Sequence, residues 1–224
     1  MAIIVGIVSQ KGGVGKSTVA RLIAREFAAQ DWQVKIADLD ISQATSFHWR
    51  SRRLQRGLEP DISVEQYGRV EQALKIAEQY DLLLLDGAPH ATQATLQIAK
   101  ASHLVILPTG LAIDDLQPGV QLAHELVTHI PRQRLVFALC RVGIRQPEID
   151  EARQYLREAG YTVLPGELPE KAAYRRASDE GRAATETRFA SLNRRAEVLA
   201  QSVVNRLSSL TTLQPQRQRS TQHG

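Results

Sequence analysis

The sequence predicts an α/β fold built on a single doubly wound, mostly parallel sheet with helices on both faces. Short apolar runs rich in β-branched residues alternate along the chain with longer segments of helical period. A glycine-rich loop joins the first apolar run to the first helical segment. The chain has 224 residues, of which 43% are hydrophobic, so it is long enough to bury one sizeable core.

The first half of the chain alternates strands and helices from the N-terminus. Its apolar runs end at polar or glycine-rich turns, and the segments between them repeat apolar residues every three or four positions. One run contains four consecutive leucines, which is typical of a strand buried on both faces. The predicted strands are residues 3–8, 34–38, 62–66 and 81–86, and the predicted helices are residues 16–30, 43–56 and 69–79.

The second half continues the alternation and ends in a long amphipathic helix. The predicted strands are residues 103–107, 135–139 and 162–164, and the predicted helices are residues 92–99, 114–129, 148–159 and 170–180. In the last helix, residues 191–208, one apolar stripe is expected to pack on the sheet. The stripe consists of Leu192, Ala196, Leu199, Val203 and Leu207. Residues 1–210 are thus predicted to form one domain, and residues 211–224, which are polar and basic, a disordered tail.

The composition excludes several classes of protein. No run approaches the ~18 apolar residues of a membrane-spanning helix, and the N-terminal apolar run does not resemble a signal peptide. The single cysteine, Cys140, is expected in a buried strand and fits a reducing cytoplasm. The histidines show no zinc-binding spacing. The net charge is +4, and its excess is concentrated after Lys171, which indicates an anionic partner.

The first motif is the loop Gln-Lys-Gly-Gly-Val-Gly-Lys-Ser-Thr at residues 10–18. A phosphate-binding loop needs glycines so that its N–H groups point inward, a lysine for the β- and γ-phosphates and a hydroxyl for magnesium. Lys16 and Ser17 fill the last two roles, at a strand-to-helix junction whose amides favour an anion. The predicted nucleotide contacts in this loop are Gly12, Gly13, Val14, Gly15, Lys16, Ser17 and Thr18. The lysine at position 11 is not required by such a loop.

Two acidic motifs follow predicted strands. Asp38 and Asp40 come at the end of the second strand, where an acid beside a phosphate loop holds magnesium through water or orients the attacking water. An acid here can equally cap the next helix, a role that Ser42 would also fill. Asp86 ends the leucine strand and is expected to contact magnesium, with the Gly87 N–H close to the γ-phosphate. The predicted metal-site residues are Ser17, Asp38 and Asp86.

Together these motifs resemble the ParA/MinD family of deviant Walker-A ATPases, over about residues 3 to 207. The resemblance implies a P-loop NTPase fold, ATP or ADP with Mg²⁺ as cofactors, and a homodimer that forms with ATP. In the family the signature lysine, here Lys11, reaches the phosphates bound by the partner subunit, where a cation neutralises charge on the transferred phosphoryl group. The residues that the resemblance makes catalytic are Lys11, Lys16 and Asp40.

The chain departs from the family pattern at three places. Ile41 and Ser42 replace a single proline after Asp40, and Ala88 replaces the first proline after the leucine strand. Cys140-Arg141 stands where the family often has Asn-Arg to read adenine, so adenine recognition is assigned to a loop at residues 166–171. In that loop Leu168-Pro169 resembles the turn that flanks the base, so the resemblance adds Pro169 to the predicted nucleotide contacts.

Arginines in the last two helices and their connection suggest a DNA-binding surface. In partition members of the family, basic residues of this region bind DNA without sequence preference, largely by phosphate neutralisation. The predicted contacts are Arg175, Arg176, Arg182, Arg188, Arg194 and Arg195. Interleaved acids make a solvated helical face the alternative. A second cluster, Arg50, Arg52, Arg53 and Arg56 beside Trp49, is expected either to bind a partner or to form charged exterior.

The resemblance favours a cytoplasmic, nucleoid-associated partition ATPase. Its ATP-bound dimer would coat DNA, and a ParB-like centromere-binding or adaptor protein would trigger slow hydrolysis. One alternative is a MinD-like membrane-associated ATPase, but the tail after residue 210 has almost no bulky apolar residues to bind a membrane. Another is an ATP-dependent ligase or synthetase of the same superfamily.

Overall fold

The computed structural model describes residues 2–90 and 92–210, and it contains a seven-stranded sheet in the order β3-β2-β4-β1-β5-β6-β7. Every strand pairing in this sheet is parallel, so the predicted fold class is confirmed. The strands are β1 (Ile3–Ile7), β2 (Val34–Asp38), β3 (Ser63–Gln66), β4 (Leu82–Asp86), β5 (Leu104–Thr109), β6 (Leu135–Val142) and β7 (Thr162–Pro169). The predicted tail at 211–224 lies outside the described residues.

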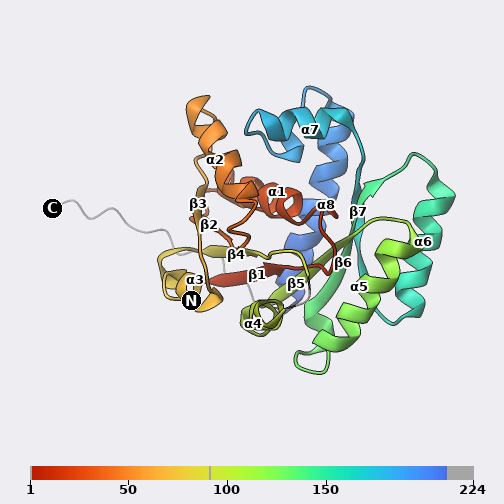
Figure 1. The fold of residues 1–224 in the computed structure, drawn as a ribbon. Helices are drawn as coiled ribbons and strands as arrows, with labels where there is room; N and C mark the ends of the chain where they lie inside the picture. The colour runs from red at the N-terminus through yellow and green to blue at the C-terminus, as the bar shows by residue number, and fades with distance from the viewer. Residues whose placement is uncertain (1, 91, 211–224) are drawn as a thin grey trace.

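Helices cover both faces of the sheet (Figure 1). On one face α1, α2 and α8 enclose the core that contains Phe27, Trp49 and Leu199, and on the other α3 to α6 enclose the core that contains Phe137 and Leu156. The α-helices are α1 (Lys16–Ala28), α2 (Thr45–Gln55), α3 (Val70–Leu74), α4 (Gln93–Ala101), α5 (Ile113–Leu126), α6 (Gln146–Glu158), α7 (Ala172–Asp179) and α8 (Ala190–Leu210). Three 3₁₀-helices are also present: η1 (Ala77–Gln79), η2 (Arg132–Arg134) and η3 (Ala184–Glu186).

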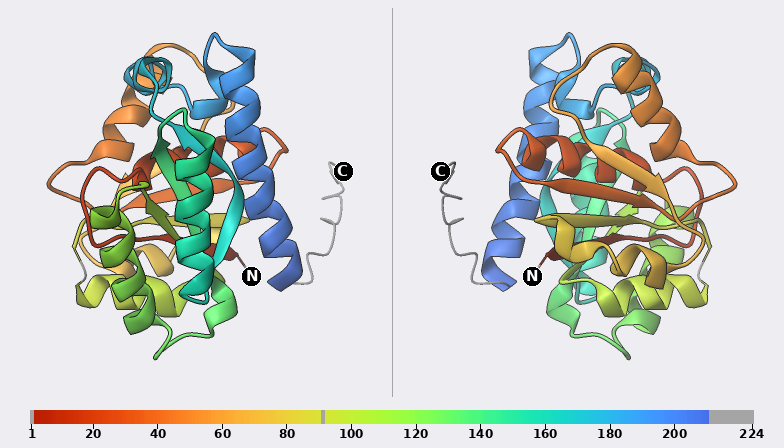
Figure 2. Two further views of the ribbon diagram at one scale, coloured as in Figure 1. Left: turned by 90° about the vertical axis from the view of Figure 1, so that its right-hand side faces the viewer. Right: turned by 90° about the vertical axis from the view of Figure 1, so that its left-hand side faces the viewer.

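The predicted packing of the last helix is confirmed for four of the five stripe residues, whereas Leu192 is only partly buried. In α8 the apolar stripe from Ala196 to Leu207 is buried, and the helix runs along the side of the molecule against the sheet (Figure 2). Among the described residues, no helix combines the length and apolar character needed to cross a membrane.

Two sequence predictions need correction. The last strand does not end at Leu164 but continues to Pro169, so most of the predicted loop at 166–171 is strand. Pro165 and Gly166 suggested a turn, but β7 is an edge strand, where a proline costs no ladder hydrogen bond, and register shifts against β6 accommodate the bend. The predicted helix at 69–79 is divided into α3 and η1, both of which bury their alanines against the same core.

The sheet brings the three predicted motifs to one edge. β1 lies between β4 and β5, so the strand order reverses beside it, and ligands of such sheets bind outside the carboxyl ends of the strands at this point. In the strand register Asp86 is the partner of both Ile7 and Asp38. The glycine loop, the Asp38 segment and the Asp86 segment therefore start side by side.

Candidate nucleotide-binding site

The loop after β1 has the backbone of an anion-binding turn. Gly13 and Gly15 have φ angles of 76° and 110°, in the left-handed region that favours glycine. A side chain at Gly15 would also meet the Cβ of Cys140 at 3.1 Å. No side chain caps α1 after Gly15, so the first amides of the helix face the loop with their hydrogen-bonding capacity free for an anion.

Lys16 is held inside the loop. Its Nζ donates to Ser9 Oγ at 3.0 Å and to the Lys11 carbonyl at 3.3 Å, and only 8% of the residue is exposed. Burial lowers the pKa of Lys16, while the charges of Asp86 and Asp40 raise it. Ser9, which sequence reasoning missed, also donates to the Lys11 carbonyl and so supports both lysines. Its position directly before the loop was the available signal.

Lys11 points away from the loop that contains it. Its Nζ forms an ion pair of 2.9 Å with Asp115 Oδ1, in the first turn of α5, and 43% of its side chain is exposed. The two lysines of one motif therefore have different surroundings: Lys16 is buried at the phosphate loop, and Lys11 lies at the molecular surface.

The Asp86 carboxylate is buried, and its two oxygens differ in their hydrogen bonds. Oδ2 accepts a hydrogen bond of 2.7 Å from Ser46 Oγ, whereas Oδ1 is buried with no hydrogen-bond partner in the described part of the chain. Burial raises the pKa of Asp86 to about 6, and the charge of Asp38 acts in the same direction, while the Ser17 side chain lowers it. A buried carboxylate oxygen without a donor, next to a hydroxyl, fits a magnesium ion or its bound water.

Asp38 and Asp40 differ in what they contact. Asp38 Oδ2 accepts hydrogen bonds from the backbone N–H groups of Ser46 and Phe47 at 2.9 and 3.1 Å, and thereby caps the start of α2. Asp40 Oδ1 instead accepts from Ser42 Oγ at 2.6 Å and from the Gln43 N–H, which closes a turn beside the phosphate loop. Of the two acids for which helix capping was the alternative role, Asp38 is the one that caps α2.

The expected role of Gly87 is not supported. Its N–H donates to the Ile7 carbonyl at 3.0 Å, because the parallel ladder between β1 and β4 continues one residue past Asp86. The amide is therefore committed within the sheet and does not face the phosphate loop. A side chain at position 87 would meet the same carbonyl, so the glycine serves close packing.

Two cavities adjoin the glycine loop. The first, of about 220 Å³, is lined by the loop and Lys16 together with Asp40, Gly87, Arg21 and Ser178. The second, of about 380 Å³, shares Gly13 and Thr18 with the first and is also lined by Cys140, Arg141 and Pro169. The predicted phosphate and base residues consequently lie in adjoining hollows.

Arg141 forms one wall of the second cavity. It adopts a φ of 55°, and its guanidinium binds both oxygens of Glu170, at 2.9 and 3.2 Å, as well as the Gly13 carbonyl. Cys140 is buried at its floor, and burial raises the pKa of its thiol to about 12. The side chain therefore remains a neutral thiol near neutral pH.

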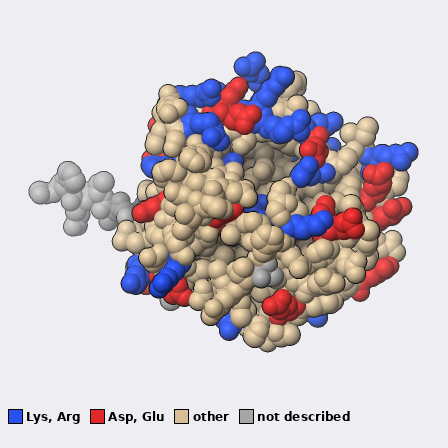
Figure 3. Space-filling view, in the orientation of Figure 1, with Lys and Arg blue, Asp and Glu red and all other residues tan. Residues whose placement is uncertain are grey.

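The arginines predicted to bind DNA differ in their surroundings. Lys and Arg side chains gather over α2 and α7 at the top of the molecule (Figure 3). Ion pairs hold Arg175 to Glu170, Arg182 to Glu180 and Arg195 to Glu167. Within the described residues, the remaining predicted contacts, Arg176, Arg188 and Arg194, form no ion pair.

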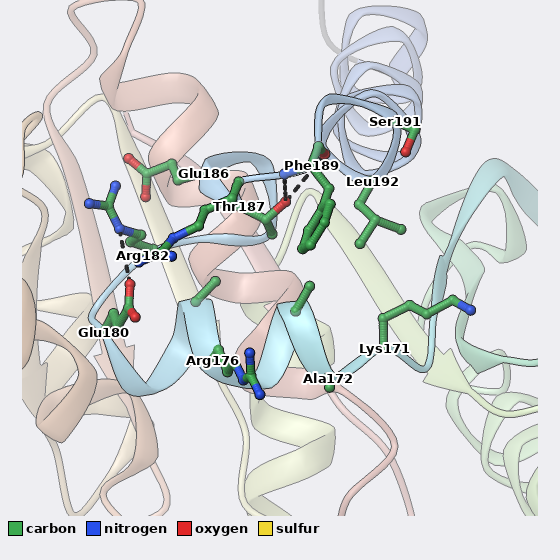
Figure 4. A pocket seen from close by; sticks show the side chains of 13 residues that line it. Lys171, Ala172, Arg176, Glu180, Arg182, Glu186, Thr187, Phe189, Ser191 and Leu192 are labelled. Atoms are coloured by element: carbon green, nitrogen blue, oxygen red, sulfur yellow. Dashed lines mark hydrogen bonds and ion pairs between the residues drawn. The ribbon is translucent and has the colours of Figure 1, made fainter.

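A groove of about 560 Å³ separates α7 from the start of α8. Phe189 and Leu192 point toward α7, whose alanines form the opposite wall, and Lys171, Arg176 and Arg182 lie around it (Figure 4). The phenylalanine is 58% exposed. The basic surface thus surrounds a small apolar hollow.

The second basic cluster is not a continuous surface. Trp49 and Arg53 have no exposed area, so both belong to the interior. Arg53 is paired with Glu186 at 2.8 Å, and Trp49 donates its indole N–H to the Arg182 carbonyl. The expectation of a partner surface is wrong for these two residues, because they join α2 to the segment between α7 and α8.

A glycine loop with buried Lys16, on an all-parallel sheet with Asp38 and Asp86 at adjacent strand ends, defines a P-loop nucleotide-binding protein. Residues 5–184 match the CobQ/CobB/MinD/ParA nucleotide binding domain family. The chain belongs to this family, which is part of a superfamily of nucleotide-binding ATPases.

Known relatives support the same assignment. The chain is 31% identical, over 180 residues, to a maintenance of carboxysome distribution protein A from Gloeobacter kilaueensis, covering 80% of this chain and 82% of the relative. A MinD complexed with Mg-ADP from Pyrococcus horikoshii shares the fold, with a TM-score of 0.73, 18% identity and coverage of 95% and 100% of the two chains. A plasmid partition protein from Borrelia burgdorferi bound to AMPPNP gives a TM-score of 0.70 at 17% identity and covers 92% and 99%.

Proposed function

We propose that this chain is a ParA-type positioning ATPase that forms an ATP-dependent sandwich dimer, binds DNA without sequence preference and hydrolyses ATP slowly when an adaptor protein stimulates it. The observation that carries the proposal is the separation of the two lysines. Lys16 is buried at its own phosphate loop, whereas Lys11 is exposed, and Asp115 is its one charged partner within residues 2–90 and 92–210. A second cation at the surface, beside the loop, suits the phosphates of a second subunit.

The remaining site residues have separate roles in this proposal. Ser17 and Asp86 would hold Mg²⁺, and Asp86 has one oxygen, Oδ1, without a hydrogen-bond partner among the described residues; Asp38 maintains the start of α2 beside them. Bound Mg²⁺ would neutralise charge on the phosphates. Asp40, at the edge of the first cavity, orients the attacking water, and Pro169 contacts the adenine from the second cavity. Gly12 to Gly15 and Thr18 donate backbone hydrogen bonds to the phosphates.

The decisive experiment compares the two lysines. Lys11→Ala is expected to bind ATP but to lose ATP-dependent dimerisation and hydrolysis, because its charge acts on the partner's phosphates. Lys16→Ala is expected to lose ATP binding itself. Fluorescent ATP binding and sedimentation velocity with a slowly hydrolysed analogue measure both properties.

Asp115→Asn is the matched control for this comparison. It releases Lys11 from its ion pair without removing the cation, so dimerisation with ATP is expected to persist or strengthen. A Lys11→Ala variant that still dimerises with ATP would contradict the sandwich dimer.

DNA and a protein adaptor are the proposed partners, and the carboxysome-distribution relative favours positioning of a cargo. The predicted DNA-binding arginines are Arg175, Arg176, Arg182, Arg188, Arg194 and Arg195. Cosedimentation of the ATP-bound protein with plasmid DNA, and in parallel with anionic liposomes, tests this choice. Binding to liposomes but not to DNA at low salt would favour the MinD-like alternative.

A further inference from the structure

Arg21 connects elements that the proposed function does not link. It lies on α1 four residues after Ser17, so both side chains are on the same face of the helix. Side chains of a helix lean toward its N-terminus, which brings the guanidinium toward the glycine loop. Arg21 accordingly lines the phosphate cavity together with Lys16, Asp40 and Ser178.

The guanidinium is buried and only partly satisfied. Arg21 is 4% exposed, and its Nη2 has no hydrogen-bond partner within the described residues. Burial lowers its pKa to about 10, so it remains a cation at neutral pH, and the charges of Asp86 and Asp38 offset that burial. A buried charge is unfavourable unless nearby groups compensate it. The guanidinium of Arg21 is therefore expected to stay beside Asp86 and Asp38.

One branch of the guanidinium leads to Asp86. Arg21 Nε donates to Ser46 Oγ at 3.2 Å, and the Ser46 hydroxyl donates in turn to Asp86 Oδ2 at 2.7 Å. Ser46 belongs to the first turn of α2, and its backbone N–H is bound by Asp38. Arg21 thus determines how a hydroxyl of α2 approaches the proposed magnesium-binding acid.

The other branch leads to α7. Arg21 Nη1 donates to Ser178 Oγ at 3.0 Å, near the C-terminal end of α7, and Arg52 donates to the backbone carbonyl of the same serine at 3.4 Å. The same helix carries Arg175 and Arg176 on its exposed side. The sequence separation between Arg21 and Ser178 is 157 residues, so only the fold brings them together.

We propose that Arg21 is a positioning residue that couples the occupancy of the nucleotide site to the position of α7. The coupling rests on the proposed nucleotide site but not on DNA binding. If nucleotide binding shifts Asp86 or the start of α2, Ser46 moves, and with it the acceptor of the Arg21 Nε hydrogen bond. Because the guanidinium is planar and rigid, its Nη1 then moves relative to Ser178. The unpartnered Nη2 leaves one donor free to gain an acceptor in the second arrangement.

Hydrogen exchange of α7 measures this coupling without requiring DNA. Each protein is compared with and without saturating Mg-ATP, and peptides covering residues 172–179 are followed by mass spectrometry. In the wild type, ATP is expected to change the exchange rate of this helix about five-fold or more, the lower range of typical coupling between sites. In Arg21→Met and in Ser178→Ala the change is expected to disappear.

Conservative variants separate coupling from mere stability. Ser178→Thr keeps the hydroxyl and is expected to restore the response, whereas Arg21→Lys keeps the charge but not the rigid fork and is expected to leave it weak. Arg25→Met is the matched control, since it removes a half-buried arginine one turn later that pairs with Glu26 and Glu186, and it is expected to keep the response.

The outcomes distinguish this proposal from the proposed function. Failure of the wild type to bind fluorescent ATP would overturn the nucleotide site and the coupling with it. Wild-type protein that binds ATP without any response of α7, or a folded Ser178→Ala variant with a full response, would overturn the coupling alone. If Arg21→Met does not fold, the Ser178 pair decides the question.

Discussion

At the scale of single residues, Asp86 shows how the site opposes stability. Its pKa is raised by burial and by the charge of Asp38, from an ordinary 3.8 to about 6. Between these two values the folded protein holds a proton that the unfolded chain releases. Stability is therefore lost as the pH rises through this window, and the protein at neutral pH carries the full cost of a buried carboxylate.

Replacement of this acid is expected to stabilise the protein without ligands. Asp86→Asn removes the buried charge and should increase the free energy of unfolding at pH 7.5 by up to about 3 kcal/mol. The gain should shrink toward pH 4, where the wild-type carboxyl is protonated. Urea titrations at both pH values, without nucleotide, measure it.

The same substitution is expected to weaken the binding of Mg-ATP, because a neutral amide replaces a charged oxygen ligand. A variant that is less stable than the wild type at pH 7.5 would contradict the assigned cost of the carboxylate. An unchanged magnesium requirement for ATP binding would argue against its metal role.

At the scale of elements, α2 is fixed at both ends by interactions that its own sequence does not reveal. Asp38 caps its start from the end of β2, and Arg53 anchors its last turns from inside the protein. The Arg53 guanidinium donates to the carbonyls of Glu59, Pro60 and Gly181 and to both oxygens of Glu186. The helix after the Asp40 turn is thus joined to the segment that follows α7.

Loss of this buried ion pair should destabilise the whole chain. Arg53→Met leaves Glu186 with only Arg25 as a charged partner, and a cost of about 3 to 5 kcal/mol is expected in urea unfolding. Arg53→Met combined with Glu186→Gln should lose less, because the carboxylate that has lost its closer partner is then neutral. Arg50→Met, on the same helix, removes a longer, more exposed pair with Asp61 and should cost at most about 1 kcal/mol. Equal losses for Arg53 and Arg50 would contradict this assignment.

These elements also show what the sequence could predict. Apolar periodicity located the strands and most of the helices, because side-chain burial repeats with the period of each element. It could not show that Trp49 and Arg53 face inward, since their partners lie more than a hundred residues away. It also ended β7 early, because Pro165 and Gly166 are turn residues unless the strand lies at an edge.

For the candidate site, the sequence predicted the residues of motifs but not the residues that support them. The spacing of the glycine loop predicted Lys16 and Ser17 as site residues, and the ends of the apolar runs predicted Asp38, Asp40 and Asp86. Sequence reasoning missed Ser9, although it stands directly before the glycine loop, and it missed Ser46 and Arg21, because a lone serine or arginine within a predicted helix carries no spacing signal. The contacts of Ser46 with Asp38 and Asp86 depend on the register that places these two acids opposite each other.

At the scale of the whole molecule, charge is unevenly distributed. Lys and Arg side chains concentrate over α2 and α7, and Arg176, Arg188 and Arg194 lack ion pairs within the part of the chain that the structure describes. Cations without an internal partner lose less on binding a phosphate than cations that must first leave a carboxylate. These three arginines should therefore contribute most to the proposed DNA binding.

Substitution of these three arginines by alanine should weaken DNA binding and its dependence on salt together. Each lost phosphate contact is expected to reduce the slope of log affinity against log salt by about 0.9. Arg157→Ala is the control and should leave the slope unchanged, because Arg157 is an exposed residue of α6, on the other face of the sheet. Fluorescence anisotropy with a labelled duplex, between low and physiological salt, provides the slopes. A lower affinity with an unchanged slope would contradict direct phosphate contacts.

The enclosed thiol beneath the glycine loop also has a practical consequence. Cys140 is the only cysteine of the chain, is 1% exposed, and has a pKa raised to about 12 by burial. It should therefore resist maleimide reagents while the protein is folded. Cysteines introduced on α7 and on α2 can thus carry a donor and an acceptor dye in the otherwise native sequence, so that single-molecule fluorescence can follow the distance between these helices during a nucleotide cycle.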